Sequence, residues 1–315
     1  MKSDAPSVPM EITVCPMCKS DDSTLLFEGS DLLHPREERF RLVTCQSCGH
    51  IYQNPRPSVD DIGQYYPDDY IPFQHAIEDE PHWWKRIDRW YGLHRRCIAV
   101  HQAAGQVGRI LDIGCATGIF LDGVRRKGWQ TQGVELVPSA ADYARQRFGL
   151  DVFCGTLEQA HFANHSFDAV TLWDVLEHLH EPREALEEIV RILRPGGLLV
   201  LSLPNPDSLE ARLIGNEWLG WDLPRHLNLF RPLLLREHLS RIGFEVEQIR
   251  SFTAGYAVLV MSLEQKLRLA GHDPTQLVRV LRSWPMRLLS MPYYAGPANW
   301  YNLSSIMVVF ARVKG

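Results

Sequence analysis

The chain has 315 residues, 45% of them hydrophobic, which is enough for one large domain or two smaller ones with a substantial core. It has no run of about 18 uncharged apolar residues and no apolar signal-peptide core, so neither a transmembrane helix nor secretion is expected. The formal net charge of −5 is unevenly placed: residues 1–80 hold 6 Lys and Arg against 15 Asp and Glu, and residues 255–315 hold 7 against 2. The acidic first quarter argues against a nucleic-acid partner there, because contacts to phosphate need positive charge.

Two Cys-x-x-Cys pairs lie near the N-terminus, 26 residues apart. A short turn lets both thiolates of a pair face one tetrahedral ion, and short strands expected at 24–27 and 40–44 complete a zinc-ribbon pattern. A redox role is the alternative for one such pair, but two pairs at this spacing favour metal over disulfides and fit a reducing, cytoplasmic setting. Four sulfur ligands leave no open position, so we expect structural zinc, with His50 a neighbour of the site. The predicted ligands are Cys15, Cys18, Cys45 and Cys48.

A rigid, extended segment follows the ribbon, because Pro55 and Pro57 restrict the backbone around them. A short helix is expected at 60–66, and acidic residues up to Glu80 mark a boundary. The predicted organisation is a ribbon over 1–58, a linker over 59–80 and one further domain over 81–315.

Residues 83–104 have helical periodicity, and one face of the expected helix carries Ile87, Trp90, Tyr91, His94, Ile98 and His101. Two interpretations of the aromatic residues stay open. Trp83, Trp84 and Tyr91 either line a substrate entrance or pack in the core.

The most informative stretch is Gly108–Leu121. A buried strand is expected at 110–113, followed by a turn through Gly114 and Gly118 and a helix over 119–127. Such a turn brings backbone N–H groups to a helix start and lets a ligand approach the main chain, because glycine has no Cβ. The Gly-x-x-x-Gly spacing differs from the Gly-x-Gly-x-x-Gly of dinucleotide binders and disfavours a nicotinamide oxidoreductase. Asp112 would repel a pyrophosphate and suits a ligand with a cationic end.

The sequence Leu111-Asp-Ile-Gly-Cys-Ala-Thr-Gly118, followed by Gly133-Val-Glu-Leu136, resembles the class I S-adenosylmethionine-dependent methyltransferases. The resemblance covers about residues 81–252 and a last strand near the C-terminus. The run Cys-Gly-x-x-Tyr-x-Asn-Pro-Arg-Pro-Ser over 48–58 is similar to that of the subgroup with an N-terminal zinc-binding segment. The implied fold is α/β: a doubly wound seven-stranded sheet, mostly parallel with the last strand antiparallel, and a small N-terminal zinc ribbon.

The resemblance also implies how S-adenosylmethionine binds. Glu135, at the end of a strand expected at 129–135, would accept hydrogen bonds from the ribose hydroxyls, and a helix N-cap or surface acid is the alternative. After a strand at 151–154, relatives often carry an acid that touches the adenine amino group; here backbone groups would replace it. The methionine carboxylate would meet free N–H groups of the glycine turn. The implied cofactor-binding residues are Asp112, Gly114, Cys115, Gly118, Glu135, Leu136, Thr156, Leu157, Trp173 and Asp174.

A strand expected at 167–173 ends in a run that resembles the family's Asp/Glu-x-x-Glu-His motif. In a helical turn, Asp174, Glu177 and His178 share a face. Certain quinone-ring O-methyltransferases and small-RNA 2′-O-methyltransferases hold a divalent metal with such a cluster. Other relatives have the same residues and bind no metal there. The interpretation favoured here is that Glu177 and His178 organise the wall of the active site.

A helix over 182–193, a strand over 198–203 and a lid over 204–231 follow, and the lid is too long for a routine connection. It brings together Trp221, Asp222, Arg225 and His226. A histidine that titrates near neutral pH can take a proton from an acceptor, so His226 and His178 are candidate bases. A structural histidine in the lid is the alternative.

A helix over 232–242 and strands over 244–252 and 305–313 enclose an insert at 256–301. The apolar stripe of this insert is Leu277, Val278, Leu281, Trp284 and Leu288, with arginines beside it. A basic amphipathic helix can lie on an anionic membrane, and the alternatives are packing on its own domain or in a homodimer. Its prolines predict short helices.

The leading hypothesis is in-line methyl transfer from S-adenosylmethionine to a small-molecule acceptor, a sugar or natural-product intermediate methylated at carbon or oxygen. The alternatives are a lipid-linked glycan or quinone precursor as acceptor, or a non-catalytic binding module.

Overall fold

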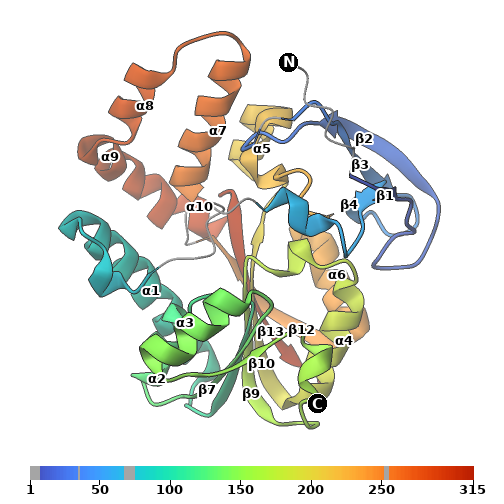
Figure 1. Cartoon of the computed structure of the whole chain (residues 1–315), viewed down its shortest axis with the longest axis vertical. Coiled ribbons are helices and arrows are strands. Elements are labelled where there is room, and N and C mark those ends of the chain that lie inside the picture. The colour runs from blue at the N-terminus through green and yellow to red at the C-terminus, as the bar shows by residue number, and fades with distance from the viewer. Residues whose placement is uncertain (1–7, 35, 67–74, 252–254) are drawn as a thin grey trace.

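The computed structural model describes residues 8–34, 36–66, 75–251 and 255–315. Its centre is a seven-stranded sheet with the order β12-β13-β10-β9-β6-β7-β8 (Figure 1). The strand β13 is antiparallel to both neighbours, whereas β10, β9, β6, β7 and β8 are parallel to one another. This confirms the predicted fold. The strands are β6 (Arg109–Ile113), β7 (Gln130–Glu135), β8 (Asp151–Cys154), β9 (Phe167–Trp173), β10 (Leu193–Pro204), β12 (Phe244–Arg250) and β13 (Ile306–Val313).

Helices cover both faces of this sheet, so its central strands are almost continuously apolar. Side chains alternate along each strand. In β10, Leu199 and Leu201 meet one helical layer, and Leu198 and Val200 meet the other. The first layer is α4 (Pro182–Ile192) and α6 (Pro232–Ile242); the second is α1 (Trp83–Ala104), α2 (Ile119–Arg125) and α3 (Pro138–Phe148).

The N-terminal segment forms a second sheet, in the order β11-β4-β3-β2. Its strand β11 comes from the predicted lid and pairs with β4, with Asn228 opposite Tyr52. The ribbon and the lid therefore share one hydrogen-bonded sheet. The strands are β2 (Ser23–Gly29), β3 (Phe40–Cys45), β4 (Ile51–Gln53) and β11 (Asn228–Leu229); β1 (Met10–Glu11) pairs separately with β5 (Arg56–Pro57), and the short 3₁₀ helices η1 (Ile62–Tyr65) and η2 (Ile77–Asp79) follow.

The core-packing alternative for the aromatic residues of α1 is wrong. Ile87, Trp90 and Tyr91 are 57%, 55% and 50% exposed, and the helix instead buries Cys97 and Val100. Only the C-terminal half of α1 packs on the sheet, in a cluster with Ile110 and Val200. The first turns extend beyond the sheet, so their aromatic side chains neither pack in the core nor follow the periodicity.

The lid and the insert are helical. Trp218 of the lid is fully buried, and its apolar cluster includes Leu259 and Leu263 of the insert. The predicted stripe of the insert is not continuous, because its helix ends at Leu281 and a new one begins at Trp284; Val278 is buried, but Leu288 is 51% exposed. The elements are α5 (Leu209–Ile214), η5 (Gly215–Glu217), η6 (Leu219–Trp221), α7 (Gly255–Leu269), α8 (Thr275–Leu281), α9 (Trp284–Ala295) and α10 (Pro297–Trp300).

Within the described ranges, no helix is both long and apolar enough to cross a bilayer.

Candidate active site

The turn between β6 and α2 requires glycine at two positions. Gly114 and Gly118 have φ angles of +68° and +77°, which L side chains rarely adopt. A Cβ on Gly114 would lie 2.6 Å from Val175 Cγ2, and one on Gly118 would lie 2.5 Å from Leu150 Cδ1. The predicted strand–turn–helix unit is confirmed, and its main chain is closely packed against the surrounding side chains.

The expectation of free N–H groups in this turn is wrong for four residues. The N–H groups of Gly114 and Cys115 donate to Val134 O at 2.8 and 3.1 Å, and that of Gly118 donates to Cys115 O at 2.9 Å. The N–H of Ala116 donates to Glu135 Oε2 at 2.8 Å. A buried turn must pair its own donors, and these pairs fix it against β7. The first N–H groups of an α-helix have no partner within the helix. In this turn, the N–H groups that can bind an anionic group of a ligand are therefore those of the first turn of α2.

Glu135 joins two backbone segments at the end of β7. Besides the bond from Ala116, its Oε1 accepts the N–H of Val137, the N-cap residue of α3, at 2.8 Å. The side chain thus joins the glycine turn to the residue before α3, but Glu135 is not the N-cap of that helix, because the N-cap is Val137. A carboxylate has about four lone-pair positions, so each oxygen can still accept a further hydrogen bond. The ribose contact stays a prediction.

Three other predicted cofactor residues turn their side chains inward. Asp112 is 2% exposed and accepts a hydrogen bond from the Thr171 hydroxyl at 2.5 Å, and burial raises the pKa of Asp112 to about 7. Cys115 is buried below Gly133, and Trp173 packs edge-on against Phe120 with ring centroids 5.2 Å apart.

Three further residues predicted to bind the cofactor lie at the surface or in the loop after β8. They are Leu136, Thr156 and Leu157. Leu136 is 68% exposed, whereas Leu157 is buried. The N–H of Thr156 donates to Gln159 Oε1 at 2.9 Å. How these residues contact a cofactor stays a prediction.

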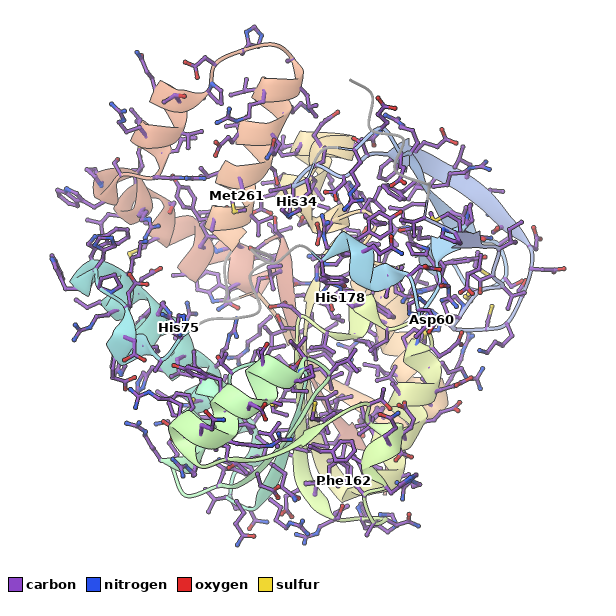
Figure 2. The ribbon with its side chains drawn as sticks, in the orientation of Figure 1. His34, Asp60, His75, Phe162, His178 and Met261 are labelled. Carbon is purple, nitrogen blue, oxygen red and sulfur yellow. The ribbon has the colours of Figure 1, made fainter. Side chains whose placement is uncertain are left out.

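The described structure brings together Glu177, His178 and His226, with one potential ligand atom of each within 4.8 Å of the others. His226 Nε2 lies 4.0 Å from Glu177 Oε1, and the two imidazole rings meet edge-on with centroids 4.8 Å apart. The motif residues come from η4 (Leu176–His178), just after β9, and His226 comes from the lid. Figure 2 places His178 near the centre of the molecule, beside η1.

The expected face of Asp174, Glu177 and His178 does not form. Asp174 has a φ angle of +57° and accepts a hydrogen bond from the Ser202 hydroxyl at 2.6 Å. The turn after it is a short 3₁₀ helix, so the three- and four-residue spacing of an α-helix does not apply. The third residue of the cluster is therefore His226 of the lid, in place of Asp174.

Both histidines are held by contacts at Nδ1. His226 Nδ1 lies 2.8 Å from Gly220 O, and His178 Nδ1 lies 3.0 Å from Arg225 O. A carbonyl oxygen only accepts, so Nδ1 of His226 carries a hydrogen, and Nε2 is the ring nitrogen that faces Glu177. His178 Nδ1 also lies 3.0 Å from the Tyr66 hydroxyl, which can donate or accept. Burial and the neighbouring His226 lower the pKa of His178 to about 3, which keeps that ring neutral.

Glu177 is the most unusual residue of the cluster. It is fully buried, and neither side-chain oxygen has a hydrogen-bond partner. Burial, and then the charge of Asp174, raises the pKa of Glu177 well above its ordinary value. A buried carboxyl group without a partner is costly, so its position points to a ligand or ion that satisfies it.

The ribbon reaches this cluster through a buried ion network. Arg225 is fully buried, and its guanidinium contacts both oxygens of Asp31 at 2.8 Å and Asp222 Oδ1 at 2.7 Å. The carbonyl oxygen of Arg225 is the group that lies 3.0 Å from His178 Nδ1. Asp31 belongs to the ribbon and was not predicted as a site residue, because an isolated acid in an acidic segment resembles solvated surface.

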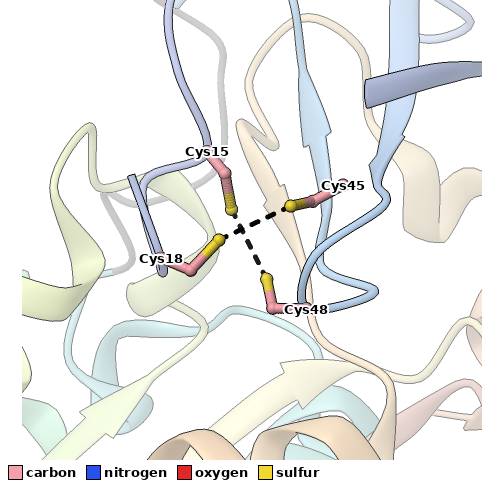
Figure 3. A group of neighbouring side chains, drawn as sticks. All are labelled: Cys15, Cys18, Cys45 and Cys48. Atoms are coloured by element: carbon pink, nitrogen blue, oxygen red, sulfur yellow. Dashed lines mark hydrogen bonds between the residues drawn. The ribbon is translucent and has the colours of Figure 1, made fainter. Parts of the chain in front are cut away.

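The four cysteines predicted as metal ligands converge (Figure 3). Cys15 Sγ lies 3.6 Å from Cys48 Sγ, and Cys18 Sγ lies 3.5 Å from Cys45 Sγ. Tetrahedral zinc with bonds of about 2.3 Å needs sulfurs roughly 3.8 Å apart, so the cluster fits zinc. His50 stays outside it and pairs with Asn228 Oδ1 at 3.0 Å, as expected for a neighbour.

Comparisons with known proteins agree with this arrangement. A family model described as "Methyltransferase domain" matches residues 73–249, more than half of the chain. Similar proteins include a ubiquinone biosynthesis O-methyltransferase from Azoarcus sp. (strain BH72), 26% identical over 200 residues that cover 58% of this chain and 86% of the relative. Another of that name, from Pseudomonas aeruginosa (strain LESB58), is 29% identical over 188 residues, covering 54% and 81%.

A solved structure of a putative methyltransferase from Bacillus halodurans C-125 is 18% identical, with a TM-score of 0.48 and coverage of 70% of this chain and 100% of that chain. With the strand order, the glycine turn and the matched family model together, the chain belongs to the class I S-adenosylmethionine-dependent methyltransferases.

Proposed function

We propose that the chain transfers the methyl group of S-adenosylmethionine to a hydroxyl oxygen of a small molecule, at the Glu177–His178–His226 cluster. The carrying observation is the convergence of two imidazoles on a buried carboxyl group whose oxygens have no hydrogen-bond partner, with His226 Nε2 4.0 Å from Glu177 Oε1. A hydroxyl attacks the sulfonium carbon well only as it loses its proton. His226 accepts that proton at Nε2, while Gly220 O holds its ring in place.

As the second possibility, the same residues fit a divalent cation, in which case His226 would be a ligand and not the base. Two imidazole nitrogens and one carboxylate are a common donor set for such ions, and the orphaned oxygens of Glu177 supply the charge. A bound cation would lower the pKa of an acceptor hydroxyl beside it. The chain's own residues then orient the acceptor, and that alignment can contribute several kcal/mol to catalysis.

The names of the relatives support oxygen as the methylated atom. Both are called ubiquinone biosynthesis O-methyltransferases, at 26% and 29% identity. Hydroxylated quinone precursors are therefore the first acceptors to test. Sugar hydroxyls, including those of nucleotide-linked sugars, are the second class.

We also propose that the cluster of four cysteines holds one structural zinc ion. The sulfur distances support it, and a site with four sulfur ligands stabilises a fold without an open catalytic position.

Two measurements test the methyl transfer: calorimetric binding of S-adenosylmethionine, and formation of S-adenosylhomocysteine with each acceptor class, with and without a chelator. Glu177→Gln and His226→Asn should keep cofactor affinity and lower turnover about a hundredfold, within the range for a general base. Glu210→Gln is the matched control, because Glu210 is also buried and has an unpartnered oxygen, but lies outside the cluster.

Full turnover in His226→Asn would overturn the assignment of the base. Glu135→Ala tests the cofactor site separately and should weaken cofactor binding. Unchanged cofactor affinity in that variant would contradict the ribose contact.

A further inference from the structure

Large aromatic side chains are exposed on two neighbouring helical regions. Five of the nine tryptophans are 49% or more exposed, although this residue type usually buries most of its surface. The "aromatic face" consists of Trp83, Trp84, Trp90 and Tyr91 of α1, Trp284 of α9 and Trp300 of α10, with exposures of 71%, 49%, 55%, 50%, 73% and 74%. Scattered apolar residues at a surface are normal, but a group of this size marks an interaction site.

The two parts of the aromatic face adjoin each other. Arg287 of α9 and Asp88 of α1 form an ion pair at 3.8 Å, and Figure 1 shows α1 and α9 along the same side of the molecule. Trp84 and Tyr91 lie one turn before and after Asp88, so they are its neighbours on the helix surface. Trp284 has the same relation to Arg287. The face therefore continues from α1 to α9.

The helices α1, α8 and α9 are rich in positive charge. Residues 83–104 and 275–295 contain 8 Lys and Arg against a single acid, Asp88, in a chain whose net charge is −5. Three of these cations have acidic partners among the described residues: Arg282 with Glu264 at 2.9 Å, Arg89 with Glu80 at 3.8 Å and Arg287 with Asp88 at 3.8 Å. The balance is still strongly basic, so the face is complementary to an anionic surface.

We propose that the aromatic face rests on an anionic lipid bilayer. Tryptophan and tyrosine favour the boundary between headgroups and acyl chains, where one edge of the ring is apolar and the other is wet. Neighbouring Lys and Arg bind anionic headgroups while their stems lie along the apolar boundary. A second copy of the chain is a poorer occupant, because a symmetric interface would bring two basic faces together.

The helix α1 packs on the sheet next to α2, which follows the glycine turn, and α7 of the same insert packs on the lid that carries His226. The proposal does not depend on the identity of the acceptor or on methyl transfer itself.

Co-sedimentation of the full chain with vesicles tests the proposal. We expect binding to phosphatidylcholine vesicles that contain phosphatidylglycerol, much weaker binding to phosphatidylcholine alone, and weakening by salt. Trp84→Ser with Trp284→Ser should lower vesicle affinity about tenfold or more, because each buried indole contributes substantially. Arg86→Glu with Arg279→Glu should remove the preference for the anionic lipid.

Leu25→Ser with Leu233→Ser is the matched control. These leucines are 50% and 75% exposed, but they lie on β2 and α6, outside the aromatic face. The control should bind vesicles like the parent chain. All variants are checked for unchanged S-adenosylmethionine affinity, so that misfolding is recognised and a failed vesicle result stays separate from a failed methyltransferase result.

Two outcomes would overturn the proposal. One is vesicle binding that is absent, or that the tryptophan variant leaves unchanged. The other is a dimer, seen by light scattering, that the same variant dissociates, which would make the aromatic face a contact between copies of the chain.

Discussion

The zinc ribbon and the helical insert both adjoin the catalytic sheet, but they are attached in different ways. The ribbon is held by apolar packing that continues into the main core and the lid, and in addition by buried polar contacts, above all Asp31 with Arg225, and His50 with Asn228. The insert is held mainly by apolar packing around Trp218 and by partly exposed ion pairs such as Arg287 with Asp88.

We infer from this difference that the ribbon is held in a fixed position and that the surface of the insert can adapt. Removing one partner of a buried ion pair leaves an uncompensated charge, so such contacts strongly disfavour a displaced ribbon. Apolar packing is less directional and exposed pairs contribute little. The ribbon can therefore hold the histidine cluster in position, whereas the insert presents the aromatic face.

The largest effect is expected from breaking the metal cluster. Cys45→Ser removes one thiolate of the four, and the chain should lose its zinc, measured by mass spectrometry of the purified protein. Metal binding of this kind contributes about 10 kcal/mol or more to the folding of small zinc domains, so the ribbon should unfold.

Because the ribbon carries Asp31, turnover should fall together with the zinc content. Cys154→Ser is the control, since Cys154 is a partly buried thiol outside the cluster. Normal turnover in zinc-free Cys45→Ser would show that the ribbon is not needed to position the active site.

The second prediction concerns the buried ion pair between Asp31 of the ribbon and Arg225 of the lid. Asp31→Asn leaves the fully buried Arg225 with less negative charge and should destabilise the chain by about 3–5 kcal/mol. Below the melting temperature, turnover should decrease more than S-adenosylmethionine affinity, because the Arg225 carbonyl orients His178. Thermal melts and steady-state kinetics measure both effects.

Asp21→Asn, an exposed acid of the same ribbon, should change neither quantity. An equal loss of cofactor affinity and turnover in Asp31→Asn would indicate general unfolding, and would contradict a positioning role for Asp31.

Much of the catalytic sheet could be predicted from sequence, because its elements have strong local signals. The strand at 151–154 and the helices at 138–148 and 232–242 have the predicted bounds. Their signals are alternating or helical apolar spacing, with proline at the first turn of both helices.

Contacts between residues far apart in the sequence had no such local signal. Asp31 and Arg225 are 194 positions apart, and nothing local distinguishes Asp31 from a solvated acid. The outward face of α1 was missed for a related reason. Periodicity shows which side chains share a face, but not how far the sheet beneath the helix extends.

The third prediction tests a polar contact of the insert. Tyr294 of α9 donates to Glu210 Oε1 of the lid at 2.9 Å, and burial raises the pKa of Glu210. The native state therefore keeps a proton that the unfolded chain releases above the ordinary glutamate pKa of about 4.3, so this group costs stability as pH rises through that range.

Glutamine keeps an acceptor for Tyr294 and removes this cost. Glu210→Gln should match the parent chain at low pH and become slightly more stable toward neutral pH, within about 1 kcal/mol. Thermal melts across pH measure the difference. A large loss of stability at neutral pH would show that the insert, like the ribbon, depends on a buried charge.

The smallest effect is expected at the ion pair between the insert and α1. Arg287 and Asp88 lie 3.8 Å apart, with side chains 46% and 67% exposed, so solvent and salt screen their attraction. Arg287→Gln should change the free energy of unfolding by less than about 0.5 kcal/mol, and the change should vanish in high salt. Denaturant titrations at two salt concentrations measure it, with Arg241→Gln, an exposed pair on α6, as the control. A loss of several kcal/mol that salt leaves unchanged would mean that α9 is fixed to α1 as firmly as the ribbon is fixed to the lid, and the contrast between the two attachments would no longer hold.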